Sequence, residues 1–199
     1  MSLPRAAAVL VLAAVVSLAV TWRIQQGFAQ EGADDPVAAA TFGVEWDYRP
    51  ASLGDLTAES QGAAVVEVTG VRSGEPFVVT EGFTVPTQLV DVKLVDPIEG
   101  SLPATFTIFK LGSDTEAPQG DSPYAAGERY LLFVRRRLDS TETKPNPDGT
   151  YLVTAPDGRF EVLPSGHLDA EVQSPVAAEL DGETVNDAEQ SIDTAEAAR

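Results

Sequence analysis

Alternation of apolar and polar residues, interrupted by turn-forming residues, is the feature that most constrains the fold of this chain. In residues 63–71 and 85–95, apolar side chains recur at about every second position. This period of two is typical of β-strands that bury one face. Residues 130–134 are apolar at every position, which is typical of a central strand.

Turn signals at Asn146-Pro-Asp-Gly149 and Pro156-Asp-Gly158 bracket a further short stretch at 151–154. The pattern predicts six or seven strands, and it favours an all-β barrel or sandwich over a parallel α/β sheet. The second long strand is expected to stop at Asp96-Pro97, with a turn at 98–103. The predicted strands cover 63–71, 85–95, 105–111, 129–138, 151–154, 159–163 and 167–172, and 77–80 is either a short strand or a loop edge.

Two helices flank the predicted strands. Ser52, with Asp55 three residues later, has the pattern of a helix start and predicts a short helix over 53–60. Near the other end, Thr184 and Asp187 resemble a second capping box, followed by apolar residues on one helical face. Nine acids and one base lie in 169–199, so this segment is either a helix docked through Ile192 or a disordered acidic tail.

The amino-terminal segment predicts export. Arg5 precedes fifteen residues, 6–20, that are apolar except for Ser17, which is the shape of a secretory signal. Small residues at Gly27 and Ala29 suit cleavage before Gln30. Alternatively, residues 6–24 form an apolar helix that anchors the chain in the membrane.

The resulting domain organisation has four parts. Residues 1–29 are a signal peptide or membrane anchor, 30–50 a linker, 51–173 the β-barrel domain, and 174–199 an acidic helix or tail. The protein is expected to be extracytoplasmic, either secreted or anchored to the cytoplasmic membrane by a single N-terminal helix.

Charge and composition exclude several kinds of site. The chain has 31 acids against 13 bases, for a net charge of −18, which argues against nucleic acid as a partner. It has no cysteine and one histidine, so disulfides, thiolate metal sites and multi-histidine metal centres are excluded. His167 is the one histidine available to a catalytic triad, but there is no G-x-S-x-G motif, so a surface histidine beside Asp169 is the simpler interpretation.

Acidic residues offer two further candidate sites. Paired carboxylates catalyse glycoside hydrolysis, but with 31 acids near neighbours also arise by chance. Oxygen ligands in the polar loop 112–127 could bind Ca²⁺, although no calcium-binding loop motif is present. The candidates for the pair are Glu67, Asp91 and Glu161 in predicted strands and Asp96 and Glu99 around a proline turn, and those for calcium are Asp114, Glu116 and Asp121.

Arg135, Arg136 and Arg137 form the densest positive patch in the sequence. They could meet an anionic polymer or lipid headgroups. The alternative is a solvated strand end whose arginines pair with the protein's own acids. From all these candidates, no catalytic, cofactor-binding or metal-binding residue is assigned, and no cofactor is expected.

The order of the central elements resembles a group of small exported bacterial domains similar to the netrin-like domain, the barrel found in tissue inhibitors of metalloproteinases. The resemblance is carried by the helix at 52–60, the strands at 64–71 and 88–97, the string Gly127-Glu-Arg-Tyr-Leu-Leu-Phe-Val134, and the hairpin over 151–162. It implies a mainly β fold, namely an OB-like closed or partly open barrel of five to seven strands. A short helix precedes this barrel and a helix follows it. Protease inhibition is not implied, because those inhibitors bind the catalytic zinc through an amino-terminal cysteine.

The function expected from the sequence is a non-enzymatic interaction or envelope-structural domain outside the cytoplasm. Its partner would be an extracytoplasmic protein or envelope component, with membrane contact only through residues 6–24 if they are not removed. One alternative is a carboxylate-based hydrolase of cell-wall glycan, which needs two carboxylates about 5–10 Å apart in one cleft. Another is an inhibitor that inserts the loop 112–127 into an enzyme.

Overall fold

The computed structural model describes residues 40–42, 48–80, 83–113, 116–118, 121–138 and 144–198. The predicted signal or anchor at 1–29, with its apolar helix, lies outside the described residues, as does most of the predicted linker. In the part of the chain that is described, no helix is both long and apolar enough to cross a membrane.

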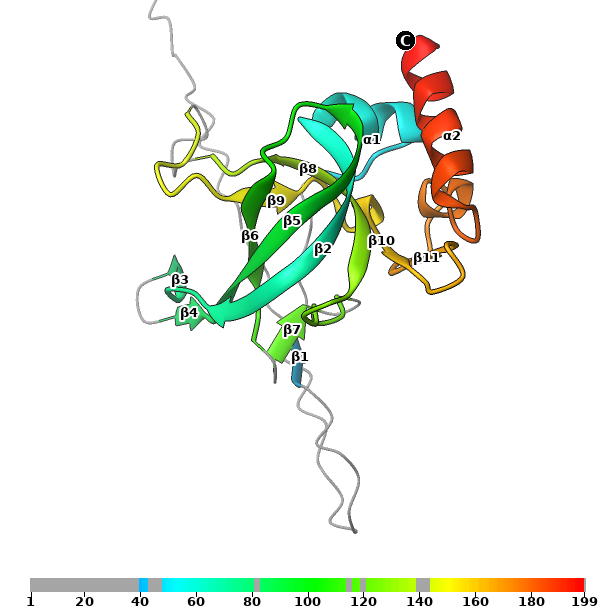
Figure 1. Cartoon of the computed structure of the whole chain (residues 1–199). Helices are drawn as coiled ribbons and strands as arrows, with labels where there is room; N and C mark the ends of the chain where they lie inside the picture. Colours follow the sequence, from blue (N-terminus) through cyan, green and yellow to red (C-terminus); the bar gives the residue numbers. More distant parts are fainter. Residues whose placement is uncertain are drawn as a thin grey trace, which may run out of the picture.

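A closed barrel of five strands forms the centre of the molecule (Figure 1). Around the barrel the order is β2–β5–β6–β9–β8, and β8 pairs again with β2. The neighbouring strands are antiparallel except β6 and β9, which are parallel. The predicted mainly β, OB-like barrel is therefore confirmed. Its strands are β2 (Gly62–Ser73), β5 (Thr87–Gly100), β6 (Thr105–Leu111), β8 (Arg129–Arg136) and β9 (Tyr151–Val153).

One edge of β8 pairs with two different strands along its length. At its C-terminal end β8 pairs with β9, but at residues 130–132 it pairs with β10 (Arg159–Val162) instead. Beyond β10 lies β11 (Leu168–Ala170), which extends the sheet away from the barrel. The short helical turn η1 (Pro156–Gly158) connects β9 to β10.

Smaller elements surround this sheet. β3 (Phe77–Thr80) and β4 (Phe83–Val85) form a hairpin between β2 and β5 that projects from the barrel (Figure 1). β1 (Ala40–Phe42), inside the predicted linker, pairs in parallel with β7 (Glu116–Pro118), inside the predicted loop 112–127. The helices are α1 (Leu53–Glu59), η2 (Ala177–Glu179) and α2 (Val185–Ala197).

Two hydrophobic cores cover the two faces of β8. Tyr130, Leu132 and Val134 point into the barrel, whereas Leu131 and Phe133 point outward to the helices. Because both faces are covered, every position from 130 to 134 is buried, and the predicted central strand is confirmed. The barrel core also includes Val66, Val68, Val90, Val92, Phe106, Ile108, Tyr124 and Tyr151, and the helix-side core includes Leu53, Leu56, Phe160, Leu168, Leu180, Ala188 and Ile192.

Both predicted helices are present. The Ser52 hydroxyl accepts a hydrogen bond from the backbone N–H of Asp55, at 3.1 Å, and caps α1. The Thr184 hydroxyl caps α2 in the same way. Ile192 is fully buried in the helix-side core, so the C-terminal segment is the docked helix rather than the disordered tail.

The predicted end of the second long strand at Asp96-Pro97 is wrong. β5 continues through Pro97 to Gly100, and the chain turns at 101–104 rather than at 98–103. Pro97 lies opposite Ala64, next to a register shift between β2 and β5. Proline is tolerated at such a bulge because the ladder there does not require its missing N–H.

Candidate functional site

The strand acids predicted as a carboxylate pair do not come together on the barrel wall. Glu67 forms an ion pair with Lys93 at 3.3 Å, and Asp91 pairs with Arg72 at 3.2 Å. Asp96 and Glu99 lie farther along β5. Of these candidates, Glu161 alone lines the pocket described below.

The acids proposed as calcium ligands do not form a common site in the described structure. Asp114 lies outside the described residues, and Glu116 is part of β7. Asp121 instead accepts contacts from two cationic side chains, Lys110 and Arg159. Across the described ranges, no group of three or more acids or histidines has the arrangement of a metal site.

The triple-arginine stretch packs largely against the protein itself. The guanidinium of Arg136 lies 5.0 Å from the ring centre of Tyr151. That of Arg137 lies 3.8 Å from the ring centre of Phe109, and its Nη1 forms an ion pair with Asp148 at 3.0 Å. This arrangement favours the solvated strand end over a patch that is free to bind anions.

His167 is exposed in the turn before β11, as expected of a surface histidine. Its Nδ1 lies 2.7 Å from the backbone carbonyl oxygen of Gly182. His167 therefore links β11 to the segment that leads into α2, and no hydroxyl nucleophile is among its hydrogen-bond partners in the described structure.

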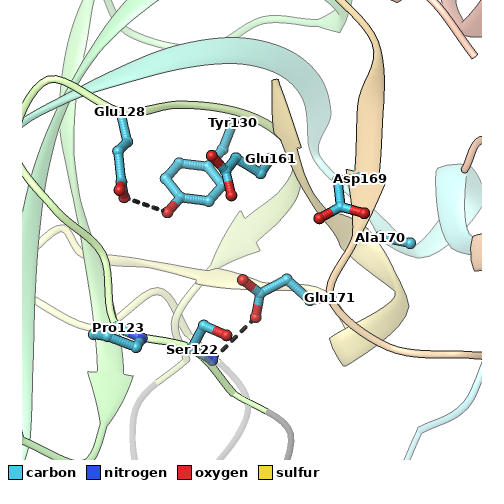
Figure 2. Close-up of a pocket in the computed structure, with 8 residues that line it drawn as sticks. All are labelled: Ser122, Pro123, Glu128, Tyr130, Glu161, Asp169, Ala170 and Glu171. Carbon is cyan, nitrogen blue, oxygen red and sulfur yellow. Dashed lines mark hydrogen bonds between the residues drawn. The ribbon is translucent and has the colours of Figure 1, made fainter. Parts of the chain in front are cut away.

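A pocket of about 380 Å³ lies where β10 and β11 diverge from the barrel (Figure 2). Four of the side chains that line it are carboxylates, and one is a tyrosine. The lining residues are Ser122, Pro123, Glu128, Tyr130, Glu161, Asp169, Ala170 and Glu171.

Strand register brings three of these side chains into one row. Tyr130 on β8 is directly opposite Glu161 on β10, and Glu161 is directly opposite Asp169 on β11. Directly paired residues project from the same face of a sheet, so the three side chains point to one side. The segment 121–128 supplies the other wall through Ser122, Pro123 and Glu128.

A buried ionic network fixes that wall. Arg159 is only 4% exposed, and its guanidinium contacts Asp121 at 2.9 Å and Glu171 at 3.2 Å. Lys110, also buried, contacts Asp121 at 3.1 Å. Two cations and two carboxylates therefore balance one another, as buried charges must.

The same cations hold the backbone of the segment 121–128. The carbonyl oxygen of Ser122 accepts hydrogen bonds from Lys110 at 2.6 Å and from Arg159 at 2.7 Å. The Arg159 guanidinium also lies 3.6 Å from the ring centre of Tyr124 and 4.7 Å from that of Tyr130. These cation–π contacts lock Tyr124 into the barrel interior, so the wall of the pocket is preorganised.

Burial shifts the pKa values of the network. It raises the pKa of Glu171, although Arg159 and the backbone N–H of Ser122 oppose the shift. It lowers the pKa of Lys110, which the Asp121 carboxylate opposes. The pKa of Tyr130 is raised by burial and by the neighbouring Glu128, which accepts a hydrogen bond from its hydroxyl at 2.6 Å.

The four pocket carboxylates differ in what they contact. Glu128 accepts hydrogen bonds from Tyr130 and from the backbone N–H of Ala125, and Glu171 is held by Arg159. The side chains of Glu161 and Asp169 have no hydrogen bond or ion pair within the described structure, and the two residues lie directly opposite each other. Like charges directly opposite on a sheet are destabilising, so this pair is suited to receive a positive group.

Sequence reasoning named Glu161, Asp169 and Asp121 but missed the network that organises them. The burial of Lys110 was predictable, because in the strand 105–111 it lies on the same face as the buried Phe106 and Ile108. A lysine on the buried face of a strand indicates a carboxylate or other acceptor nearby that pairs with its ammonium group. Its partners, Asp121 and Ser122, lie in the next loop of the chain, 112–127, but no pattern in that loop indicates which of its residues return to Lys110.

No known protein family matches this chain, and no curated protein is significantly similar to it. The function is therefore inferred from the pocket and from the surfaces of the barrel.

Proposed function

We propose that this protein is an exported, non-enzymatic interaction domain that holds a positively charged group of its partner in the pocket beside β8, β10 and β11. The observation that carries the proposal is the uncompensated pair of carboxylates, Glu161 and Asp169, opposite each other in that pocket. The partner's lysine or arginine side chain would relieve their repulsion.

The rigid surroundings of the pair support a binding role. Arg159 and Lys110 neutralise Asp121 and Glu171 behind the wall. The charge that remains in the pocket is that of Glu161, Asp169 and Glu128, and the Glu128 carboxylate is already hydrogen-bonded by Tyr130 and the backbone N–H of Ala125. The segment 121–128 is held by the buried network and need not reorganise when a ligand enters, which reduces the cost of binding. The overall charge of −18 also steers a basic partner toward the protein.

The test is a comparison of two double variants that change the net charge equally. Glu161→Gln with Asp169→Asn removes the pocket pair, and Glu189→Gln with Asp193→Asn removes two exposed acids from α2. A tetralysine peptide should bind the wild type and the α2 variant alike, and the pocket variant about tenfold more weakly at low salt. Equal losses in both variants would show attraction to total charge alone and would remove the proposal.

Partner identification requires the intact protein in its own envelope. A photocrosslinking residue in place of Ser122, which is exposed, uncharged and lines the pocket, should trap a neighbour through a basic segment. The same residue in place of Glu189 on α2 is the control. A neighbour trapped equally from both positions would contradict the pocket as the binding site.

A second candidate is a hydrolase of envelope glycan, because the four carboxylates converge on one pocket. Glu171 is the best general acid of the four, since burial raises its pKa. Against this role, one of its oxygens already contacts Arg159 and the other accepts the Ser122 N–H. Release of reducing sugar from purified cell-wall glycan, abolished by Glu171→Gln but not by Glu189→Gln, would establish the hydrolase instead.

The inhibitor alternative has less support. It requires the loop 112–127 to enter an enzyme, whereas Ser122 and Tyr124 of that loop are tied to the barrel by Arg159. Deleting the described part of the loop that lies outside these contacts, Glu116–Pro118, should leave partner binding unchanged.

We also infer that the chain is exported and is related to the netrin-like barrels. The closed five-stranded barrel, with a helix before it and a helix after it, supports that relationship. Residues 6–20 support export. Recovery of the protein from outside the cytoplasm tests export. The intact mass of the recovered protein then distinguishes cleavage before Gln30 from retention of the anchor.

A further inference from the structure

A strip of outward-facing side chains runs along β5 and β6, on the barrel wall away from the pocket. Three directly paired rows make up the strip: Leu89 with Phe109, Asp91 with Thr107, and Lys93 with Thr105. Alternate residues of the same strands, such as Val90 and Ile108, point into the barrel core. At about 3.3 Å per residue, the three rows span roughly 13 Å.

An aromatic cluster closes one end of this strip. Phe77, on the projecting hairpin, contacts Phe109 edge-on, with ring centres 6.4 Å apart. Arg137 stacks on Phe109 and is oriented by Asp148. Three separate segments, the hairpin, β6 and the residues after β8, therefore meet at one aromatic site, and Phe77 is still 42% exposed there.

Polar groups continue from the aromatic cluster along the strip. The Thr107 hydroxyl donates to Asp91 at 2.7 Å, and Arg72 contacts the same carboxylate at 3.2 Å. Side chains of this kind present a fixed row of donors and acceptors beside the exposed ring. The strip thus places one exposed apolar ring beside oriented polar groups.

The charges of the strip cancel locally, although the chain as a whole is strongly acidic. Arg137 pairs with Asp148, Arg72 with Asp91, and Lys93 with Glu67. This surface therefore has no net charge to offer an ionic ligand. It matches a neutral ligand that has one apolar face and a rim of hydrogen-bonding groups.

We infer that the strip and Phe77 together form a binding surface for a neutral oligosaccharide. A pyranose ring presents C–H groups on its face and hydroxyls around its edge. The C–H face packs on the exposed ring of Phe77, since aromatic faces attract the positive edges of C–H groups. The hydroxyls bond to Asp91, Thr107 and Asp148. This surface is separate from the acidic pocket and does not depend on the function proposed for it.

The test titrates the full chain with three neutral hexasaccharides, chitohexaose, cellohexaose and maltohexaose, followed by backbone amide NMR. At least one should shift the amides of Phe77, Thr107 and Phe109. Phe77→Ala should weaken that binding about tenfold, and Phe77→Tyr should retain it. Val78→Ala is the matched control, because Val78 is adjacent on the same strand, 65% exposed, and faces the other side.

Two further measurements distinguish sugar binding at this strip from binding in the acidic pocket and from the effect of total charge. Glu161→Gln should leave hexasaccharide binding unchanged, so failure of the pocket proposal and failure of this one are distinguishable. A hexamer of galacturonic acid should bind more weakly than the best neutral sugar, because the chain carries −18. The inference is overturned if none of the neutral hexasaccharides binds, if the shifted amides lie elsewhere, or if Val78→Ala weakens binding as much as Phe77→Ala.

Discussion

Replacing Arg159 by alanine should be among the most destabilising single changes outside the hydrophobic cores. The guanidinium is buried and neutralises Asp121 and Glu171, and it also holds the Ser122 carbonyl. Removing one partner of a buried ion pair leaves the other charge uncompensated in a medium of low polarity, which costs about 3–5 kcal/mol. Total stability is about 5–15 kcal/mol for a domain of ordinary size, so this is a large share.

The matched control is Arg72→Ala on the barrel wall. Arg72 and Asp91 form an ion pair of similar length, but their side chains are 54% and 40% exposed. An exposed pair contributes about 0–1 kcal/mol, because water solvates both groups when the pair is broken. The two variants therefore remove the same side chain from contacts that differ mainly in burial.

The assay is urea unfolding followed by circular dichroism at neutral pH, with the same slope fitted for all three proteins. Arg159→Ala should lower the free energy of unfolding by at least about 2 kcal/mol more than Arg72→Ala does. Arg159→Met separates charge from volume, since it restores packing but not the ion pairs, and it should recover less than half of the loss. Equal effects of the two alanine variants would refute the assignment of Arg159 as the organising residue of the pocket wall.

Three other changes test the surrounding structure. Gly100 has a φ of +72°, and a Cβ there would meet the Gln61 carbonyl oxygen, so Gly100→Ala should lower the free energy of unfolding in urea by at least about 3 kcal/mol. The control is Gly166→Ala, which should cost about 1 kcal/mol, because Gly166 has a similar φ of +85° but open space around it. Folding raises the pKa of Glu171, so the protonated side chain stabilises the fold fully below pH 4.5, the ordinary pKa of a glutamate, and this stabilisation is lost as the pH rises through the raised pKa. Glu171→Gln should remove this part of the pH dependence of the urea midpoint. Thr184→Ala removes the cap of α2 and should cost about 1 kcal/mol by the same assay.

The strands and helix caps were predictable from the sequence because their signals are local. The first five residues of β2 are buried on both faces and only its later part alternates about the barrel core, and the unbroken apolar run in β8 likewise reflects two covered faces. Ser52 and Thr184 cap the helices they precede, and each bonds to the residue three positions on. In these elements, each residue's neighbours along the chain largely decide its structure.

Long-range pairing explains what could not be predicted. Pro97 predicts the end of a strand, but a register shift against β2, in a distant part of the chain, accommodates it. The ion pair between Asp121 and Arg159 joins residues 38 positions apart. The pairing of Glu161 with Asp169 was nearly predictable, because both residues lie in predicted strands on either side of the turn at Ser165-Gly166. Placing them directly opposite each other, however, requires the register of the two strands, which the sequence does not specify.

The proposed role of the pocket is tested most directly by mapping where a basic ligand contacts the protein. Backbone amide NMR during a titration with tetralysine should shift the signals of Ser122, Glu161, Asp169 and Ala170 first and most strongly, and about 0.3 M salt should weaken the effect without moving it to other residues. Shifts concentrated instead on the exposed acids of α2, or spread evenly over the acidic surface with none at Glu161 and Asp169, would contradict a binding role for the pocket.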